Sequence, residues 1–210
     1  MTSITERSPY GPNYSFLVKK EEYFDHLRYQ IECFVSYSFL VYFPLGLRSG
    51  DTILDVGSCL GDLGHYLKFL GVKTAGIDLN KYAIKKGREM FGNECKNISF
   101  VGNAKNLPFS DKSFAAVVSQ DLLEHLPSEG HANQALREME RVLRGGRMYH
   151  KITVLEDPHI HADFTHSLKW PSVQWERWFT QNGYKIIGPT TRRIPMRNGI
   201  SYGHFLIERS

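Results

Sequence analysis

The sequence predicts an α/β fold in which a mostly parallel β-sheet carries helices on both faces and ends in an antiparallel edge hairpin. Three observations predict it. Short apolar, β-branched segments alternate with amphipathic segments of helical periodicity over much of the chain. The first of these strands runs into a glycine-bearing turn that opens a helix. The last two apolar segments are separated by Asn198 and Gly199, which are typical of a turn between antiparallel strands.

Each element has its own local signal. A long amphipathic helix is expected over Glu21–Phe43, because Pro44 and Gly46 end the apolar pattern. Gly71 closes the helix after the first strand, and Asn80 is a good N-cap for the next helix. Further helices are expected from about Gly61 to Leu70, at Lys81–Met90, from about His131 to Leu143, and after Pro171. Strands are expected at Thr52–Val56, Lys73–Ile77, Ile98–Val101, Phe114–Ser119, Arg147–Val154, Tyr184–Ile187 and His204–Glu208.

Length and composition place the chain among single-domain globular proteins. Its 210 residues are 41% hydrophobic and 23% charged, and the formal net charge of +4 is too small to argue for nucleic acid. Three cysteines without metal spacing fit a reducing compartment, and the start of the chain lacks a secretion signal, so a cytoplasmic location is expected. The most apolar window, Cys33 to Leu47, is too short to span a bilayer, and no membrane partner is expected.

The run Asp55-Val56-Gly57-Ser58-Cys59-Leu60-Gly61 predicts a site for a nucleoside. Its glycines allow the backbone to approach a ligand closely, and Asp78, at the end of the second strand, can accept hydrogen bonds from ribose hydroxyls. The alternative is that the two carboxylates only cap a strand and a turn.

Five segments, in this order, resemble the class I S-adenosylmethionine-dependent methyltransferases, a family with a seven-stranded Rossmann-like sheet. They are the run from Asp55 to Gly61, Asp78, Gly102–Phe114, Leu122–Leu126 and Arg137–Gly146. The resemblance covers roughly residues 50–155. Three positions depart from the family pattern. Cys59 stands where a second glycine is common and would be strained at a positive φ, Asn103 replaces a common Asp, and Ala115 replaces another.

The resemblance implies S-adenosylmethionine as cofactor and S-adenosylhomocysteine as product. It places Asp55, Gly57 and Gly61 at the methionine part and Asp78 at the ribose. The full set of cofactor-binding residues expected from it is Asp55, Gly57, Ser58, Gly61, Asp78, Leu79, Asn103, Ala104 and Gln120.

Candidate catalytic histidines follow the fourth and fifth strands, at the edge where open α/β sheets bind ligands. Asp121, Glu124 and His125 come after the fourth strand, and His125 is a candidate general base. The segment Asp157–His166 concentrates polar groups, with His159, His161 and His166 as further candidates. It has three interpretations, a substrate pocket, a metal site or a loop whose histidines only form hydrogen bonds. The pocket is favoured, so no metal ligand is assigned.

The sequence therefore predicts a methyltransferase that acts on an oxygen or nitrogen of a small molecule. A nucleic-acid or protein methyltransferase and a non-catalytic cofactor-binding module are the alternatives. Within one domain we expect an N-terminal arm and lid-like helix (1–47), a cofactor-binding core (48–155) and a substrate-side segment (156–210). A homodimer is among the expected states, because an N-terminal arm and an edge hairpin are common dimer elements.

Overall fold

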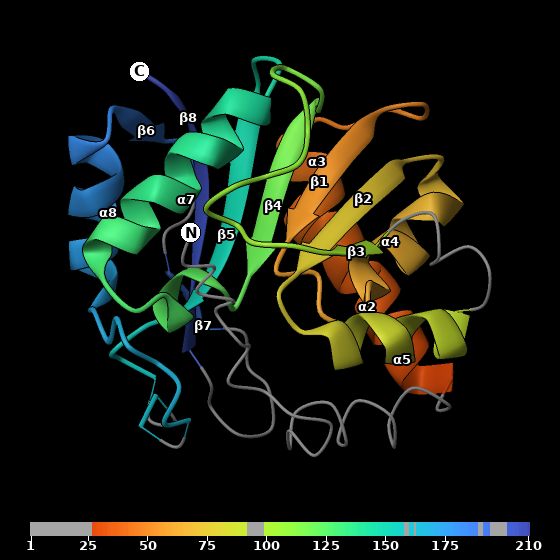
Figure 1. Ribbon diagram of the computed structural model, residues 1–210, viewed down its shortest axis with the longest axis horizontal. Helices are drawn as coiled ribbons and strands as arrows, with labels where there is room; N and C mark the ends of the chain where they lie inside the picture. The colour runs from red at the N-terminus through yellow and green to blue at the C-terminus, as the bar shows by residue number, and fades with distance from the viewer. Residues whose placement is uncertain (1–26, 92–98, 158–159, 162, 189–190, 194–200) are drawn as a thin grey trace, which may run out of the picture.

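The computed structural model describes residues 27–91, 99–157, 160–161, 163–188, 191–193 and 201–210, which form one β-sheet with helices on both faces (Figure 1). The strands are β1 (Thr52–Val56), β2 (Lys73–Asp78), β3 (Ser99–Val101), β4 (Ala116–Gln120), β5 (Arg147–Thr153), β6 (Tyr184–Ile186), β7 (Thr191–Arg193) and β8 (Ser201–Arg209). The helices are α2 (Leu27–Tyr37), α3 (Phe43–Leu45), α4 (Asp62–Leu67), α5 (Lys81–Phe91), α7 (Glu129–Val142) and α8 (Ser172–Gln181).

The sheet has the order β3-β2-β1-β4-β5-β8-β6, in which the first five strands are parallel and β8 is antiparallel to its neighbours. This confirms the predicted fold class. The short strand β7 also pairs with β8, through Ser201 to Gly203, and Tyr202 and Gly203 pair with β5 on their other side. β6 and β7 therefore share the last position of the sheet, and β7, with two arginines among its three residues, is not predicted from the sequence.

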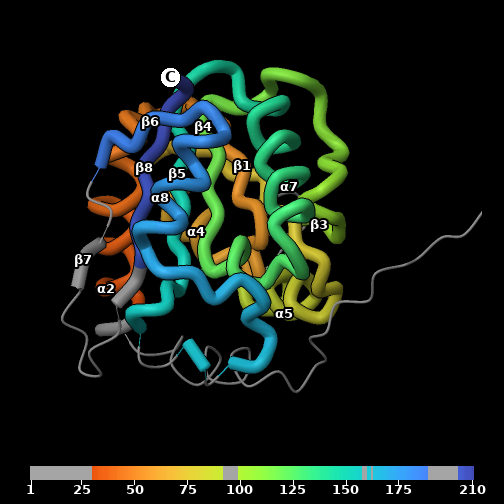
Figure 2. The backbone as a smooth tube through the Cα atoms, turned by 90° about the vertical axis from the view of Figure 1, so that its left-hand side faces the viewer, coloured from red at the N-terminus to blue at the C-terminus, as the bar shows by residue number. Residues whose placement is uncertain are grey.

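Helices cover both faces of the sheet, and α2 and α7 lie on opposite sides of β1 and β4 (Figure 2). One core joins β1, β4, β5 and β8 to the inner sides of α7 and α8, with Trp175 and Phe179 fully buried. The other joins Ile53 and Val118 of the sheet to Leu63 of α4 and Val41 near α2. Alternate residues of the same strands supply the two cores, as the two-residue period of a strand requires.

The predicted N-terminal helix is helical throughout its described part but changes its winding. After α2, a π-helical turn, η1 (Ser38–Tyr42), leads into α3, and Gly46 ends the run in the left-handed conformation at φ 66°. Pro44 has no N–H with which to continue the α-helical pattern. In the described part of the helix the side chains of Val41 and Leu45 are core residues.

Predicted and observed strand bounds differ most at β8, which begins at Ser201 rather than at His204, and next at β4. Phe114 lies outside the strand and forms an isolated bridge with Leu143, while the strand extends to Gln120. Among the described helices, none combines the length and apolar character needed to cross a membrane.

Candidate active site

The carboxyl ends of the parallel strands bring the predicted cofactor residues to one edge of the sheet. Val56 is in register with Ile77 of β2 and with Ser119 of β4. The residues that follow these three, Gly57, Asp78 and Gln120, therefore lie side by side at this edge. The described parts of the segment after β5, and the start of α5, lie on the same lower side of the sheet in Figure 1.

The turn after β1 depends on backbone conformations that favour glycine. Gly57 has φ 82° and Gly61 has φ 83°, and the N–H groups of Gly57 and Ser58 both donate to the carbonyl of Ile77, at 2.8 and 3.1 Å. Cys59, between them, also has a positive φ, 50°. The departure from the family pattern at Cys59 therefore places a side chain in a strained conformation.

Asp78 holds this turn in place through its carboxylate. Oδ2 accepts the backbone N–H of Cys59 at 2.8 Å, and Oδ1 accepts that of Asn80 at 2.7 Å. Burial raises the pKa of Asp78, and the two backbone hydrogen bonds oppose that rise. Each oxygen retains a second lone pair, so capping the turn leaves room for hydrogen bonds to a ligand.

The remaining residues near the turn differ in how much of their side chain is accessible. Asp55 is buried within β1, at 3% exposure, and Ser58 is buried with no hydrogen-bond partner for its hydroxyl among the described residues. Leu79 is 36% exposed, directly after Asp78.

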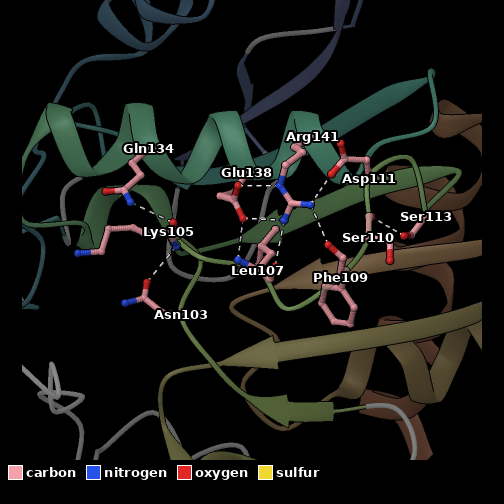
Figure 3. A network of polar contacts seen from close by, with 10 residues as sticks. All are labelled: Asn103, Lys105, Leu107, Phe109, Ser110, Asp111, Ser113, Gln134, Glu138 and Arg141. Atoms are coloured by element: carbon pink, nitrogen blue, oxygen red, sulfur yellow. Dashed lines mark hydrogen bonds and ion pairs between the residues drawn. The ribbon is translucent and has the colours of Figure 1, made fainter. Parts of the chain in front are cut away.

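The connection Gly102–Phe114, which we call the adenine-side segment after the place that the resemblance implies for it, is attached to α7 by a polar network (Figure 3). Arg141 donates to the carbonyls of Leu107 and Phe109, at 3.0 and 2.8 Å, and Glu138 accepts the N–H of Leu107 at 2.8 Å. Arg141 also pairs with Asp111 and Glu138, each at 2.8 Å. These bonds fix the connection that begins at Asn103.

The start of that connection is a turn capped by its own side chain. Asn103 Oδ1 accepts the N–H of Lys105 at 2.9 Å, and Asn103 and Ala104 are both half-buried. Asn103 therefore acts as the turn-former that Asp would be, without the charge. Gln120, the last residue of β4, is also half-buried.

His125 ends a short 3₁₀ turn, η3 (Leu123–His125), just beyond β4. Its Nδ1 lies 3.0 Å from Thr165 Oγ1, whose hydroxyl donates to Asp163 Oδ1 at 2.5 Å. A hydroxyl has one proton, so Thr165 accepts from His125, and Nδ1 of His125 carries hydrogen. Burial lowers the pKa of His125, and the charges of Asp163 and Asp121 partly oppose this.

A second histidine lies against the first. The ring centroids of His125 and His166 are 4.5 Å apart. His166 Nδ1 is 2.9 Å from the carbonyl oxygen of Ile160, which can only accept, so this Nδ1 also carries hydrogen. In their neutral forms both rings therefore have their lone pair on Nε2.

Glu124 completes the group, since one carboxylate oxygen and one ring nitrogen each of His125 and His166 lie within 4.8 Å of one another. Glu124 is fully buried, and its Oε1 accepts the N–H of Thr153 at 2.6 Å. Burial, and then the charge of Asp121, raise the pKa of Glu124 to about 8. We call Glu124, His125 and His166 the carboxylate–histidine cluster.

Beside this cluster, Asp121 bridges the ends of β4 and β5. It has φ 49°, its N–H donates to the carbonyl of Lys151 at 2.9 Å, and its Oδ2 pairs with Lys151 Nζ at 2.7 Å. A second strained residue thus lies at the same edge as Cys59.

The structure brings together two of the four predicted catalytic histidines. His125 and His166 are in contact, whereas His161 is exposed and outside the cluster, and His159 lies outside the described residues. Asp163 and Thr165, which orient His125, were not assigned a role from the sequence. Their spacing was the available signal, because an Asp often accepts the N–H two residues on, as Asp163 does from Thr165 at 2.8 Å.

Comparison with known proteins identifies the core. Residues 54–149 match the family model described as a methyltransferase domain. The chain contains a methyltransferase domain. A curated relative, the ubiquinone/menaquinone biosynthesis C-methyltransferase of Hahella chejuensis, is 37% identical over an alignment of 113 positions, which covers 49% of this chain and 43% of that protein. The match thus spans less than half the length of the relative.

Solved structures show that the methyltransferase domain has the class I fold. A protein from Pyrococcus horikoshii aligns with a TM-score of 0.69 at 19% identity, covering 89% of this chain and 93% of its own. A SAM-dependent methyltransferase from Aquifex aeolicus aligns with a TM-score of 0.66 at 15% identity, covering 95% and 99%. The family implies S-adenosylmethionine as the cofactor of the methyltransferase domain.

Proposed function

We propose that this protein transfers a methyl group from S-adenosylmethionine to an oxygen or nitrogen of a small molecule. One arrangement carries the proposal. The Asp78 carboxylate, fixed by the Cys59 and Asn80 amides, follows β2, and His125 follows β4, so the two side chains share one edge of the sheet. This arrangement supports a nucleoside site next to a group able to accept a proton.

The residues at the turn suit this cofactor. Asp78 offers free lone pairs to the ribose hydroxyls, and the buried Ser58 hydroxyl lacks a partner among the described residues. Leu79 and Ala104 offer apolar surface for the adenine, with Asn103 at its edge and Gln120 towards the methionine end. Asp55, Gly57 and Gly61 shape the turn around the methionine part. When bound, the cofactor supplies an activated methyl group on a sulfonium.

The cluster beyond β4 is suited to handling the proton that the acceptor loses. In the His125 ring, Nδ1–H is held by Thr165, so Nε2 is the nitrogen that accepts. His166 is oriented in the same way by the Ile160 carbonyl. We assign the proton-handling role to His125 and His166, while His159 and His161 remain candidates for contacts with the acceptor.

A carbon acceptor is the second candidate, and one observation favours it. The curated relatives are named as C-methyltransferases of ubiquinone and menaquinone biosynthesis, although they match only half of this chain. Methylation of a ring carbon next to a hydroxyl also requires a proton acceptor, so the same histidines would serve. The small net charge of +4 gives no support to a nucleic-acid substrate.

Two measurements test the proposal in sequence. Calorimetry with S-adenosylhomocysteine should detect binding to the full chain, and absence of binding at millimolar ligand would reject a cofactor site. Transfer of a labelled methyl group is then measured against phenols, amines and quinols. Transfer to a phenol or amine supports the proposal, transfer to a quinol carbon replaces it with the second candidate, and binding without transfer to any acceptor class leaves a non-catalytic module.

A further inference from the structure

We propose that Glu124, His125 and His166 bind one divalent transition-metal ion. Two of these residues come from η3 and the third from the segment after β5, so the site joins elements that follow neighbouring strands. One potential ligand atom from each lies within 4.8 Å of the other two. An ion that holds ligands at about 2.0–2.2 Å can bridge such a spacing once the side chains draw together.

The carboxylate is the first argument for a cation. Glu124 is fully buried, and Oε1 is held by the Thr153 N–H at 2.6 Å. Oε2 is equally buried and has no hydrogen-bond partner among the described residues. A buried carboxylate oxygen without a donor is costly, and a metal ion bound to Oε2 would remove that cost.

The orientation of the imidazoles is the second argument. Both Nδ1 atoms carry hydrogen and donate, from His125 to Thr165 and from His166 to the Ile160 carbonyl. Metal-binding histidines are held in this way, with one ring nitrogen donating to an oxygen while the other binds the ion. The Thr165 hydroxyl is itself oriented by Asp163, so the negative charge behind the ring strengthens the ligand.

The donor set indicates the class of ion. Two imidazole nitrogens and one carboxylate oxygen suit Zn²⁺, Fe²⁺ or Co²⁺, whereas Mg²⁺ and Ca²⁺ prefer oxygen ligands alone. Three protein ligands leave coordination positions open for water or for an oxygen of the acceptor. An ion bound here would occupy Nε2 of His125 and His166, so it would replace these rings in assisting the acceptor's loss of a proton, by lowering the pKa of the acceptor's hydroxyl. That catalytic role rests on the proposed function, whereas binding of the ion does not.

Titration of the full chain with Co²⁺ tests the site, because the visible absorption of the ion reports its ligands. We expect one ion per chain, bands of a site with nitrogen and oxygen ligands, no sulfur-to-cobalt charge-transfer band, and displacement by Zn²⁺. Glu124→Gln and His166→Gln should each weaken Co²⁺ binding by about 10-fold or more. His131→Gln, which removes a histidine at the start of α7, is the matched control and should bind as the unaltered chain does.

The opposite results overturn the proposal. Failure of millimolar Co²⁺ and Zn²⁺ to bind, or binding that is equal in the unaltered chain and in both variants, would mean that the cluster shares protons only. Circular dichroism checks that the His166→Gln variant is folded. We expect that it is, because the contact between His166 Nδ1 and the Ile160 carbonyl lies outside the sheet. Binding of S-adenosylhomocysteine to the unaltered chain is measured separately, without metal. Absence of that binding would reject the proposed function and would leave the result of the metal titration unaffected.

Discussion

The backbone N–H of Cys59 donates to Oδ2 of Asp78 at 2.8 Å, so the carboxylate that would bind the cofactor also holds the turn that surrounds it. We expect Asp78→Asn to lower the affinity for S-adenosylhomocysteine by about 10- to 100-fold, because it removes a charge-assisted acceptor. Calorimetry measures the effect, and the near-isosteric side chain limits disturbance of the turn. Affinity within twofold of the unaltered chain would remove Asp78 from the cofactor site.

Cys59 stores strain that glycine would release. At φ 50° a side chain is disfavoured, and we expect Cys59→Gly to raise the free energy of unfolding by about 1 kcal/mol. Cys59→Val should lower it by about 1 kcal/mol, because a branched Cβ fits this conformation still less well. Urea unfolding measures both. A Cys59→Gly variant that is less stable would show that contacts of the side chain outweigh the backbone strain.

Arg141 attaches the adenine-side segment to α7, so replacing Arg141 should weaken this attachment. Arg141→Ala loses bonds to Leu107, Phe109 and Asp111, and we expect the free energy of unfolding to fall by about 1–3 kcal/mol. Arg137→Ala, at an exposed position of the same helix, is the control and should change stability little. Equal stability of the two variants in urea would contradict a structural role for the Arg141 network.

The burial of His150 makes the free energy of unfolding depend on pH. It is fully buried between Ser119 and Phe179, and burial lowers its pKa from 6.5 to about 3. The unfolded chain therefore binds a proton between these values that the folded chain excludes. The stability contributed by neutral His150 is complete above pH 6.5 and is lost as the pH falls towards 3.

Between pH 7.5 and pH 5 this loss amounts to about 2 kcal/mol. His150→Gln should flatten the dependence of the unfolding free energy on pH in that interval, whereas His161→Gln, at an exposed position, should not. Parallel curves for His150→Gln and the unaltered chain would show that His150 does not govern the acid limb.

Thr165 is a positioning residue, because it acts on the acceptor only through His125. We expect Thr165→Val to lower kcat of methyl transfer by about 10- to 100-fold while the affinity for S-adenosylhomocysteine stays unchanged. Asp163→Asn should have a similar effect on kcat. The loss in the double variant should be smaller than the two single losses combined, expressed as activation free energies, since both residues serve one chain of hydrogen bonds. Thr180→Val, on the exposed side of α8, is the control. Full additivity would separate Asp163 from Thr165.

The sequence predicts the elements of the sheet because their signals are local. β1 was expected at its observed bounds, and α5 within one residue, since apolar periodicity and the Asn80 cap act over a few neighbours. The contact between His125 and His166 depends instead on the path of the segment after β5, which no local pattern specifies. The same limit applies to Glu124, whose buried carboxylate accepts the N–H of Thr153, a residue 29 positions further along the chain.

The conformation of Cys59 marks an intermediate case. The family pattern shows that residue 59 departs from glycine, and steric considerations show that a side chain there would be strained at a positive φ. Only the structure gives the value of φ, which is 50°. β7 could not be predicted because it depends on pairing with β8, and nothing in the sequence pattern distinguishes the π-helical turn η1 from the α-helix before it.

The backbone carbonyl of Glu124 accepts the N–H groups of Ser167 and Leu168, at 2.8 and 2.9 Å, so the segment after β5 is anchored without using the Glu124 side chain. Because these two hydrogen bonds join backbone atoms, they do not depend on the side chains that precede Ser167. Replacements between β5 and Asp163 can alter the acceptor side while this attachment point and the side chains of Asp163, Thr165 and His166 are kept. Residues 158–162 are therefore the segment to exchange when redesigning specificity.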